Sequence, residues 1–172
     1  LVLLLAACVG CDTSDTTPQP RSTAPPLDVA KKEQADPISE DTNGATSSEI
    51  SATHLHRLLK KKNPRYRSDA KFHKSGGKIL MADFFERKIS DISPLKGLVL
   101  EVVDLGHTKI NDITALQGMP LKNLNLEGTP ISDITPIEGS SIELLNLIET
   151  KVKDISPIAS LESIKIVWLR KA

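Results

Sequence analysis

The sequence predicts an α/β solenoid: a short right-handed coil of parallel strands, mostly β in content, joined by short helical turns and capped at its N-terminal end by a helix and a hairpin. Three observations lead to this prediction. A set of apolar positions returns every 21 residues from about 79 to 169. Aromatic residues make up only 3% of the 172 residues, against 39% hydrophobic residues, so a large aromatic core is excluded. The 22 basic and 22 acidic residues are unevenly distributed, which separates the repeats from the segments before them.

The chain is expected to open with a leader peptide. Residues 1–7 form an apolar run ending in small residues, typical of a secretory signal and too short to span a bilayer of about 30 Å. Leu5-Ala6-Ala7-Cys8 resembles the lipobox of bacterial lipoproteins, which implies cleavage and lipid attachment at Cys8, with Cys11 as the alternative. A leader that is secretory only, or uncleaved, remains the other interpretation. Residues 1–11 are therefore assigned to the signal peptide and lipobox.

Residues 12–46 are expected to form a disordered tether. They contain five prolines and few bulky apolar groups, and the stretch 12–50 carries eight acids against three bases. Such a composition cannot bury enough apolar surface to offset the entropy of ordering. A coil of this length holds its ends roughly 30 to 40 Å apart. We therefore expect a protein secreted across the inner membrane and lipid-anchored at the periplasmic or outer-membrane face of the cell envelope.

Residues 47–78 are assigned to the N-terminal cap. Thr46 and Glu49 have the spacing of a capping box, and apolar residues at helical intervals predict a helix over 47–62 that ends before Asn63-Pro64. Two β-prone runs, 70–74 and 78–85, flank Ser75-Gly76-Gly77 and predict a hairpin.

The repeats are assigned to residues 79–172. Each unit carries an apolar L-x-x-L-x-L triplet whose members should point inward: Ile79, Ala82 and Phe84; Leu100, Val103 and Leu105; Leu121, Leu124 and Leu126; Ile142, Leu145 and Leu147; with a partial fifth at Ile166 and Trp168. The triplets and the I-x-D-I-[ST]-P-[LI] tail that follows them resemble the internalin-type leucine-rich repeats of bacteria. The resemblance covers about residues 79–169 and implies a leucine-rich-repeat solenoid.

Polar positions recur with the same period and are given structural roles. Ser93, Thr135 and Ser156 precede prolines and should supply N-cap hydroxyls for short helical turns, which end at Gly97, Gly118 and Gly139. The column Asp91, Asp112, Asp133 and Asp154 is interpreted as a set of backbone caps. Where the resembled family usually has Asn, this chain has Arg87, Thr108, Thr129 and Thr150, so a ladder of hydroxyl groups is expected.

Function is expected on the outward, concave face of the strands, whose positions are taken to carry no structural role. A protein or peptide ligand is predicted there, because the face is more apolar than a solvated sheet needs. The predicted contact residues are Met81, Asp83, Phe85, Val102, Asp104, Asn123, Asn125, Glu127, Leu144, Asn146 and Ile148, with Lys165, Val167 and Leu169 outward in the fifth unit. Asp83 and Asp104 on adjacent strands should repel unless a cation or ligand group lies between them, or lateral hydrogen bonds and water stabilise them.

The cap offers a second candidate surface. Residues 54–78 hold nine bases and one acid, and the predicted basic patch is Arg57, Lys60, Lys61, Lys62, Arg65, Arg67, Lys71 and Lys74. It could bind anionic lipid or a polyanionic glycan, which a tethered position favours over nucleic acid. The alternative is a solvated helix whose lysines serve solubility alone.

Other classes of function are disfavoured. The four histidines are scattered, no nucleophile elbow or phosphate-binding loop occurs, and a short solenoid offers no deep cleft, so neither an enzyme nor a metal or cofactor site is expected. A third class is structural: the apolar strand 164–169 could pair with the same strand of a second copy and form a homodimer.

Overall fold

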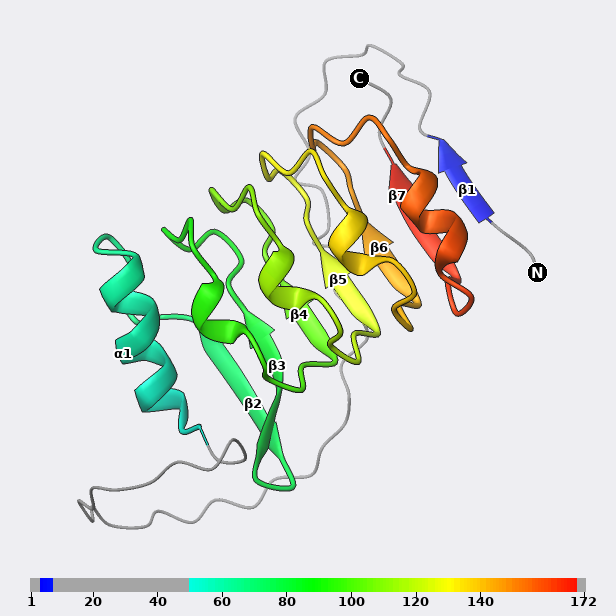
Figure 1. Ribbon diagram of the computed structural model, residues 1–172. Coiled ribbons are helices and arrows are strands. Elements are labelled where there is room, and N and C mark those ends of the chain that lie inside the picture. The colour runs from blue at the N-terminus through cyan, green and yellow to red at the C-terminus, as the bar shows by residue number, and fades with distance from the viewer. Residues whose placement is uncertain (1–3, 8–49, 170–172) are drawn as a thin grey trace, which may run out of the picture. The chain divides into compact units, whose positions relative to one another are not determined.

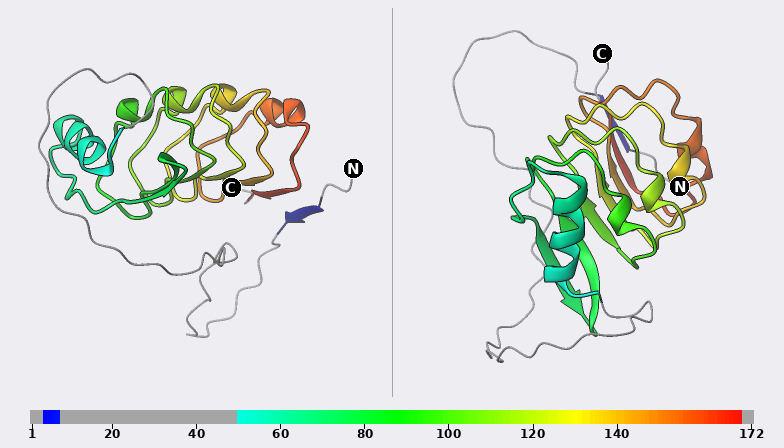
Figure 2. Two further views of the ribbon diagram at one scale, coloured as in Figure 1. Left: turned by 90° about the horizontal axis from the view of Figure 1, so that it is seen from below. Right: turned by 60° about the vertical axis from the view of Figure 1, so that its left-hand side comes forward.

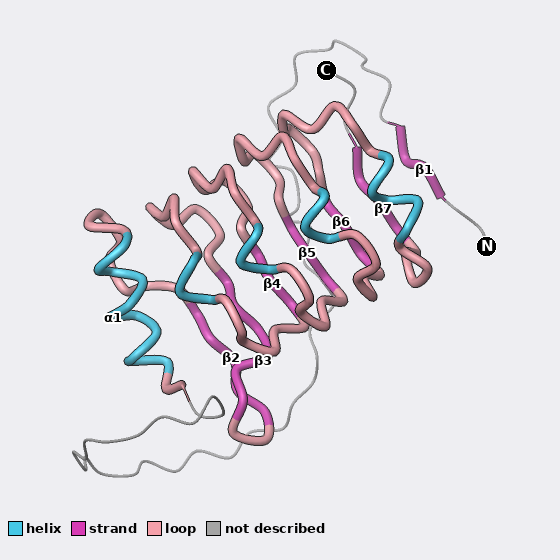
Figure 3. Tube along the Cα trace, viewed as in Figure 1, coloured by secondary structure: helices cyan, strands magenta, loops and turns pink. Residues whose placement is uncertain are grey.

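The computed structural model describes residues 4–7 and 50–169. They form one seven-stranded sheet in the order β1-β7-β6-β5-β4-β3-β2, with short helical turns along one side (Figures 1 and 3). The strands are β1 Leu4–Ala7, β2 Lys71–Ser75, β3 Lys78–Asp83, β4 Val102–Asp104, β5 Asn123–Asn125, β6 Leu144–Asn146 and β7 Ile166–Leu169. β2 is antiparallel to β3 and all other pairings are parallel. Cys8, Cys11 and the tether lie outside the described residues.

The helix of the cap, α1, spans Ala52–Lys62 and starts later than the sequence predicted. Its N-cap is Ser51, whose hydroxyl oxygen accepts the amide of His54 at 3.1 Å, so the predicted start at residue 47 is wrong. Thr46 and Glu49, the expected capping box, lie outside the described residues. Leu55 and Leu59 lie one turn apart on this helix, and both are fully buried in the core. The helix ends at Lys62, as predicted, and the hairpin of β2 and β3 follows.

Each repeat makes one coil consisting of a strand and a 3₁₀ turn: η1 Ser93–Leu95, η2 Thr114–Leu116, η3 Thr135–Ile137 and η4 Ser156–Ser160. The predicted Asp column caps all four turns, because each carboxylate accepts the amide two residues ahead at 2.8 to 2.9 Å; the pairs are Asp91–Ser93, Asp112–Thr114, Asp133–Thr135 and Asp154–Ser156. The predicted N-cap role of the hydroxyl residues is wrong, since they are the first residues of the turns and the N-cap positions make no side-chain bond. Gly97, Gly118 and Gly139 follow the turns with φ of 84°, 74° and 65°.

The inward triplets of the first four units are buried, as the alternation predicted. Side by side, Val103, Leu124 and Leu145 align across the parallel strands and form a continuous apolar core. The threonine column is also confirmed: the hydroxyls of Thr108 and Thr129 donate to carbonyls three residues earlier at 2.7 and 2.6 Å. Each hydroxyl bond therefore lies within its own coil.

The fifth unit departs from the prediction by one residue. Val167 is the inward residue, aligned with Leu145 and 6% exposed, whereas Ile166 and Trp168 align with the outward Leu144 and Asn146. The assignment of Ile166 and Trp168 to the core, and of Val167 to the outer face, was therefore wrong. The physical reason is the last turn, η4, which has five residues where the other turns have three and lengthens the coil.

β7 is not an edge strand among the described residues, because β1 pairs with it in parallel, Leu4 opposite Ile166 and Ala7 opposite Leu169. The edge expected to be open thus carries the backbone of the predicted leader (Figure 1). Within residues 4–7 and 50–169, no helix is both long and apolar enough to cross a bilayer.

Candidate binding face

The structure gathers the sequence-predicted contact residues on one face of the sheet, which we call the binding face and define as the outward positions of β3 to β6 with the residues just after these strands. The face has three columns running across the strands: Met81, Val102, Asn123 and Leu144; Asp83, Asp104, Asn125 and Asn146; and Phe85, Gly106, Glu127 and Ile148. Most of the side chains are half-buried. The turns η1 to η4 lie on the opposite side of each coil (Figure 2).

The second column has a structural role that the sequence analysis denied it. In every coil its carboxylate or amide oxygen accepts the backbone amide two residues ahead and so fixes the end of the strand; the four bonds are Asp83–Phe85 at 3.0 Å, Asp104–Gly106 at 2.9 Å, Asn125–Glu127 at 3.1 Å and Asn146–Ile148 at 3.0 Å. The expectation that outward positions carry no structural role is therefore wrong for this column. The recurring Asp or Asn at a period of 21 was the signal that could have revealed it.

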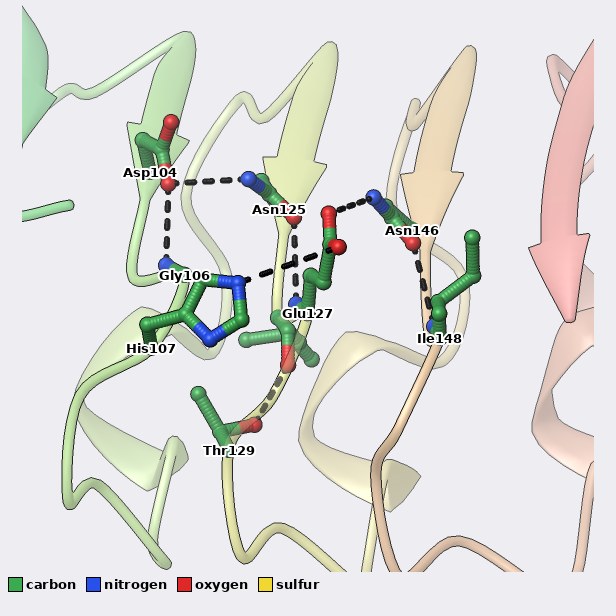
Figure 4. A network of polar contacts seen from close by, with 9 residues as sticks. Asp104, Gly106, His107, Asn125, Glu127, Thr129, Asn146 and Ile148 are labelled. Carbon is green, nitrogen blue, oxygen red and sulfur yellow. Dashed lines mark hydrogen bonds and ion pairs between the residues drawn. The ribbon is translucent and has the colours of Figure 1, made fainter. Parts of the chain in front are cut away.

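Lateral hydrogen bonds join these caps between coils (Figure 4). The Asn125 amide donates to Asp104 Oδ1 at 3.0 Å, and the Asn146 amide donates to Glu127 Oε2 at 3.0 Å. Glu127 also lies 3.8 Å from the Nε2 of His107. We call this set of cap and lateral bonds the polar ladder. It holds five side chains of the binding face in fixed positions: Asp83, Asp104, Asn125, Glu127 and Asn146.

Asp83 and Asp104 meet at the end of the polar ladder. Burial raises the pKa of Asp104, and the charges of Asp83 and Glu127 raise it further, while the bonds from Gly106 and Asn125 oppose them. Of the two sequence-based interpretations, lateral hydrogen bonding is the one that the contacts support, because Asn125 donates to Asp104. Even with this bond, the Asp104 carboxylate lies in a partly buried environment close to the charge of Asp83, which disfavours its ionised form.

The third column includes an aromatic contact that the sequence analysis missed. Phe85 is 37% exposed, and its ring meets the edge of the His107 ring at 5.3 Å between centroids. Gly106 makes room for it, since a Cβ there would lie 2.8 Å from Phe85 Cδ2. His107 has a φ of 55° and lies beyond the outward columns, so no strand alternation could place it on this face.

The basic patch is exposed as predicted, and its members differ in their contacts. Lys60 donates to the carbonyls of Pro64 and Tyr66, so its ammonium group stabilises the turn after α1. Arg57 lies 3.0 Å from His54 on the helix. Arg65, Arg67, Lys71 and Lys74 are exposed, as are Lys61 and Lys62.

Chemistry at a metal centre has no support in this part of the chain. Over residues 4–7 and 50–169, no three His, Cys, Asp or Glu side chains come together as a metal site requires. The acidic side chains of the polar ladder accept hydrogen bonds from amides. The arrangement suits contact with another molecule's side chains and backbone.

Part of this chain is similar to a solved structure. No protein-family profile and no curated protein matches the chain. Internalin C2 from Listeria monocytogenes is 33% identical over 48% of this chain and 38% of that chain, with a TM-score of 0.43. The chain thus spans less than half of the length of that protein. Over about half of its own length, this chain is similar in sequence to a bacterial internalin.

Proposed function

We propose that the chain is a non-catalytic interaction module that binds a protein or peptide on its binding face. The observation that supports this most is the set of apolar side chains in the first and third columns, which flank the second column of Asp and Asn residues. Met81, Val102 and Leu144 lie on one side, and Phe85 and Ile148 lie on the other. A ligand covering both columns would bury apolar surface at about 25 cal/mol per Å².

The polar ladder supports the same proposal through its rigidity. Side chains that already hold one geometry lose little conformational entropy when a ligand arrives, so more of the contact energy appears as affinity. The carboxylates of Asp83, Asp104 and Glu127 can each accept more than the bonds described, so they can receive donors from a ligand. Binding would therefore combine two apolar strips with a central row of acceptors.

A charged substitution on the binding face tests the proposal. Ile148→Arg adds a large cation to the third column without entering the core, and should weaken binding of a partner about ten-fold or more, because buried apolar anchors carry most of an interface's energy. Ile155→Arg is the matched control, since Ile155 is an exposed isoleucine, 49% accessible, at the start of η4 on the other side of the coil.

Partners are first identified by photo-crosslinking in the native envelope, with the crosslinker at position 148 and, as a control, at position 155. Affinity of the purified partner is then measured for both arginine variants. Equal recovery of the partner from the two crosslinking positions, or equal affinity of the two variants, would refute the binding face.

We further propose that the module is held at the cell envelope by a lipid on Cys8, with Cys11 as the alternative. The support is the lipobox-like Leu5-Ala6-Ala7-Cys8. Mass spectrometry of the mature N-terminus, with Cys8→Ser and Cys11→Ser as controls, tests this. An unmodified Cys8 on a protein recovered in the soluble fraction would contradict the anchor.

A further inference from the structure

The N-terminal cap presents a cationic surface of its own, distinct from the binding face. The single acid between residues 54 and 78 is Asp69. It forms an ion pair with Arg87, 3.5 Å between Oδ2 and Nε, and Arg87 belongs to the repeats and not to the bases of the cap. We define the basic cap surface as five exposed basic residues of the cap: Arg57, Lys61, Arg65, Arg67 and Lys74. Lys60 is left out because it donates to backbone carbonyls. Lys62 and Lys71 are left out because carboxylates lie near them, Asp91 and Asp83 respectively.

The geometry of α1 directs these charges away from the core. Leu55 and Leu59 are fully buried one turn apart, and Arg57 and Lys61, also one turn apart, occupy the opposite side of the helix. After the helix the pattern alternates: Tyr66 is fully buried, while its neighbours Arg65 and Arg67 are exposed. α1 lies at the N-terminal end of the row of 3₁₀ turns (Figure 2), so this surface forms one end of the coil.

We propose that the basic cap surface docks against an anionic lipid bilayer. Its charges come from a helix, the segment after it and a strand, so they are offered to a surface broader than one helix face. Tyr66 is buried and Phe72 packs on Phe84, 5.7 Å between ring centroids, so these cap rings do not offer the stacking surfaces that single-stranded nucleic acids use. The inference rests on the proposed tether: once the leader is cleaved before Cys8, the cap is the first folded element that follows residues 12–46 along the chain.

The charge distribution also orients the domain. Residues 54–78 carry nine bases and one acid, whereas residues 79–172 carry thirteen acids and ten bases. Near an anionic surface the cap end is attracted and the repeats are weakly repelled. Docking through the cap therefore leaves the binding face open to a partner in the surrounding space.

Co-sedimentation with vesicles tests the proposal without the lipid anchor. The probe is the full chain carrying Cys8→Ser and Cys11→Ser, so that a failure of lipidation cannot affect the result. Vesicles of phosphatidylcholine alone are compared with vesicles containing about 30% phosphatidylglycerol, at about 25 mM and about 250 mM salt. Each base near the surface contributes about five-fold to binding, so Arg57→Glu, Lys61→Glu and Arg65→Glu together should lower it about a hundred-fold or more.

The matched control carries the same change of net charge on the repeats: Lys109→Glu, Lys151→Glu and Lys153→Glu, all at exposed positions. Circular dichroism confirms that both triple variants fold, and Arg57→Lys with Arg65→Lys should keep full binding because the charge remains. Salt-sensitive binding to the anionic vesicles alone, lost only in the cap variant, supports docking. Three results overturn it: no binding at low salt, an equal loss in the control variant, or binding to soluble polyphosphate with none to vesicles. Lipidation of Cys8 is scored separately, by mass spectrometry of the native protein.

Discussion

Asp104 is an acidic residue whose environment disfavours its charge, because burial raises the pKa of its carboxyl group. It occupies a column in which the next two coils use Asn125 and Asn146, and it accepts the same backbone bond as they do. An asparagine at 104 could make that bond too, and it would carry no charge beside Asp83. Keeping a carboxylate here costs stability, which is common at positions that contact ligands.

We expect Asp104→Asn to raise the free energy of unfolding at pH 7 by about 1 kcal/mol, the scale of a like-charge contact between adjacent strands. Because folding raises the pKa of Asp104, the folded state binds its proton more tightly, and this group's contribution to stability falls as pH rises above the ordinary carboxyl pKa of 3.8. Denaturant titrations of wild type and variant at several pH values measure both effects.

Asn125→Asp provides the opposite change at the same contact. It removes the amide that donates to Asp104 and adds a third carboxylate, so it should lower the free energy of unfolding. If Asp104→Asn proved destabilising at neutral pH, the description of this carboxylate as unfavourably placed would be wrong.

At the scale of elements, the 3₁₀ turns depend on their aspartate caps to different degrees. η1, η3 and η4 each have a proline at one of their first two positions. The proline ring fixes φ of that residue near the helical value before folding, which favours the turn. η2, Thr114–Leu116, has none, and its entry is held by the bond from the Thr114 amide to Asp112 at 2.8 Å. The cap at Asp112 should therefore matter most.

Asp112→Ala is expected to lower the free energy of unfolding by about 1 kcal/mol, the usual loss when a capping oxygen is removed. Asp112→Asn should keep most of the wild-type stability, because its amide oxygen can accept the same bond. Asp133→Ala is the comparison at a turn that keeps its proline, and it should cost less even though Asp133 also accepts the Thr135 hydroxyl at 2.8 Å. Thermal or urea unfolding measures all three. Equal losses of stability at positions 112 and 133 would show that the proline of η3 does not compensate for a missing aspartate cap.

At the scale of the whole molecule, each coil contacts mainly its neighbours, and the last strand is where a further strand can add. β1, from the predicted leader, pairs with β7 in parallel. The N–H and C=O groups of β7 that β1 engages would face solvent if the leader were removed. The sequence-based prediction of self-association through this strand therefore applies to the chain without its leader.

We expect a chain that lacks residues 1–11 to self-associate with increasing concentration in sedimentation velocity, while the full chain does so less. Trp168→Lys in the shortened chain should restore the monomer, because a charge on an edge strand opposes pairing. A shortened chain that stays monomeric at about 100 µM would eliminate pairing through β7 at any ordinary concentration.

Much of the fold was predictable because its determinants are local and repeated. The period of 21 and the alternation within each triplet identify the buried residues, such as Leu124 and Leu145, since burying apolar surface is the largest favourable term. The Asp caps could also be assigned, because an acceptor two residues before each turn satisfies the same amide in every coil. The hairpin followed from the glycines between its strands.

What the sequence could not decide depends on distances between coils and on packing. The sequence predicted a helix that starts at residue 47, whereas the structure starts it after Ser51, whose hydroxyl oxygen accepts the amide of His54. The position of Val167 followed from the length of η4. By itself, then, the sequence determined which residues of the first four units face the core. Tertiary structure alone decided how Asp104, Asn125 and Glu127 meet across neighbouring coils, because such hydrogen bonds depend on separations of a few tenths of an ångström that no periodic pattern encodes.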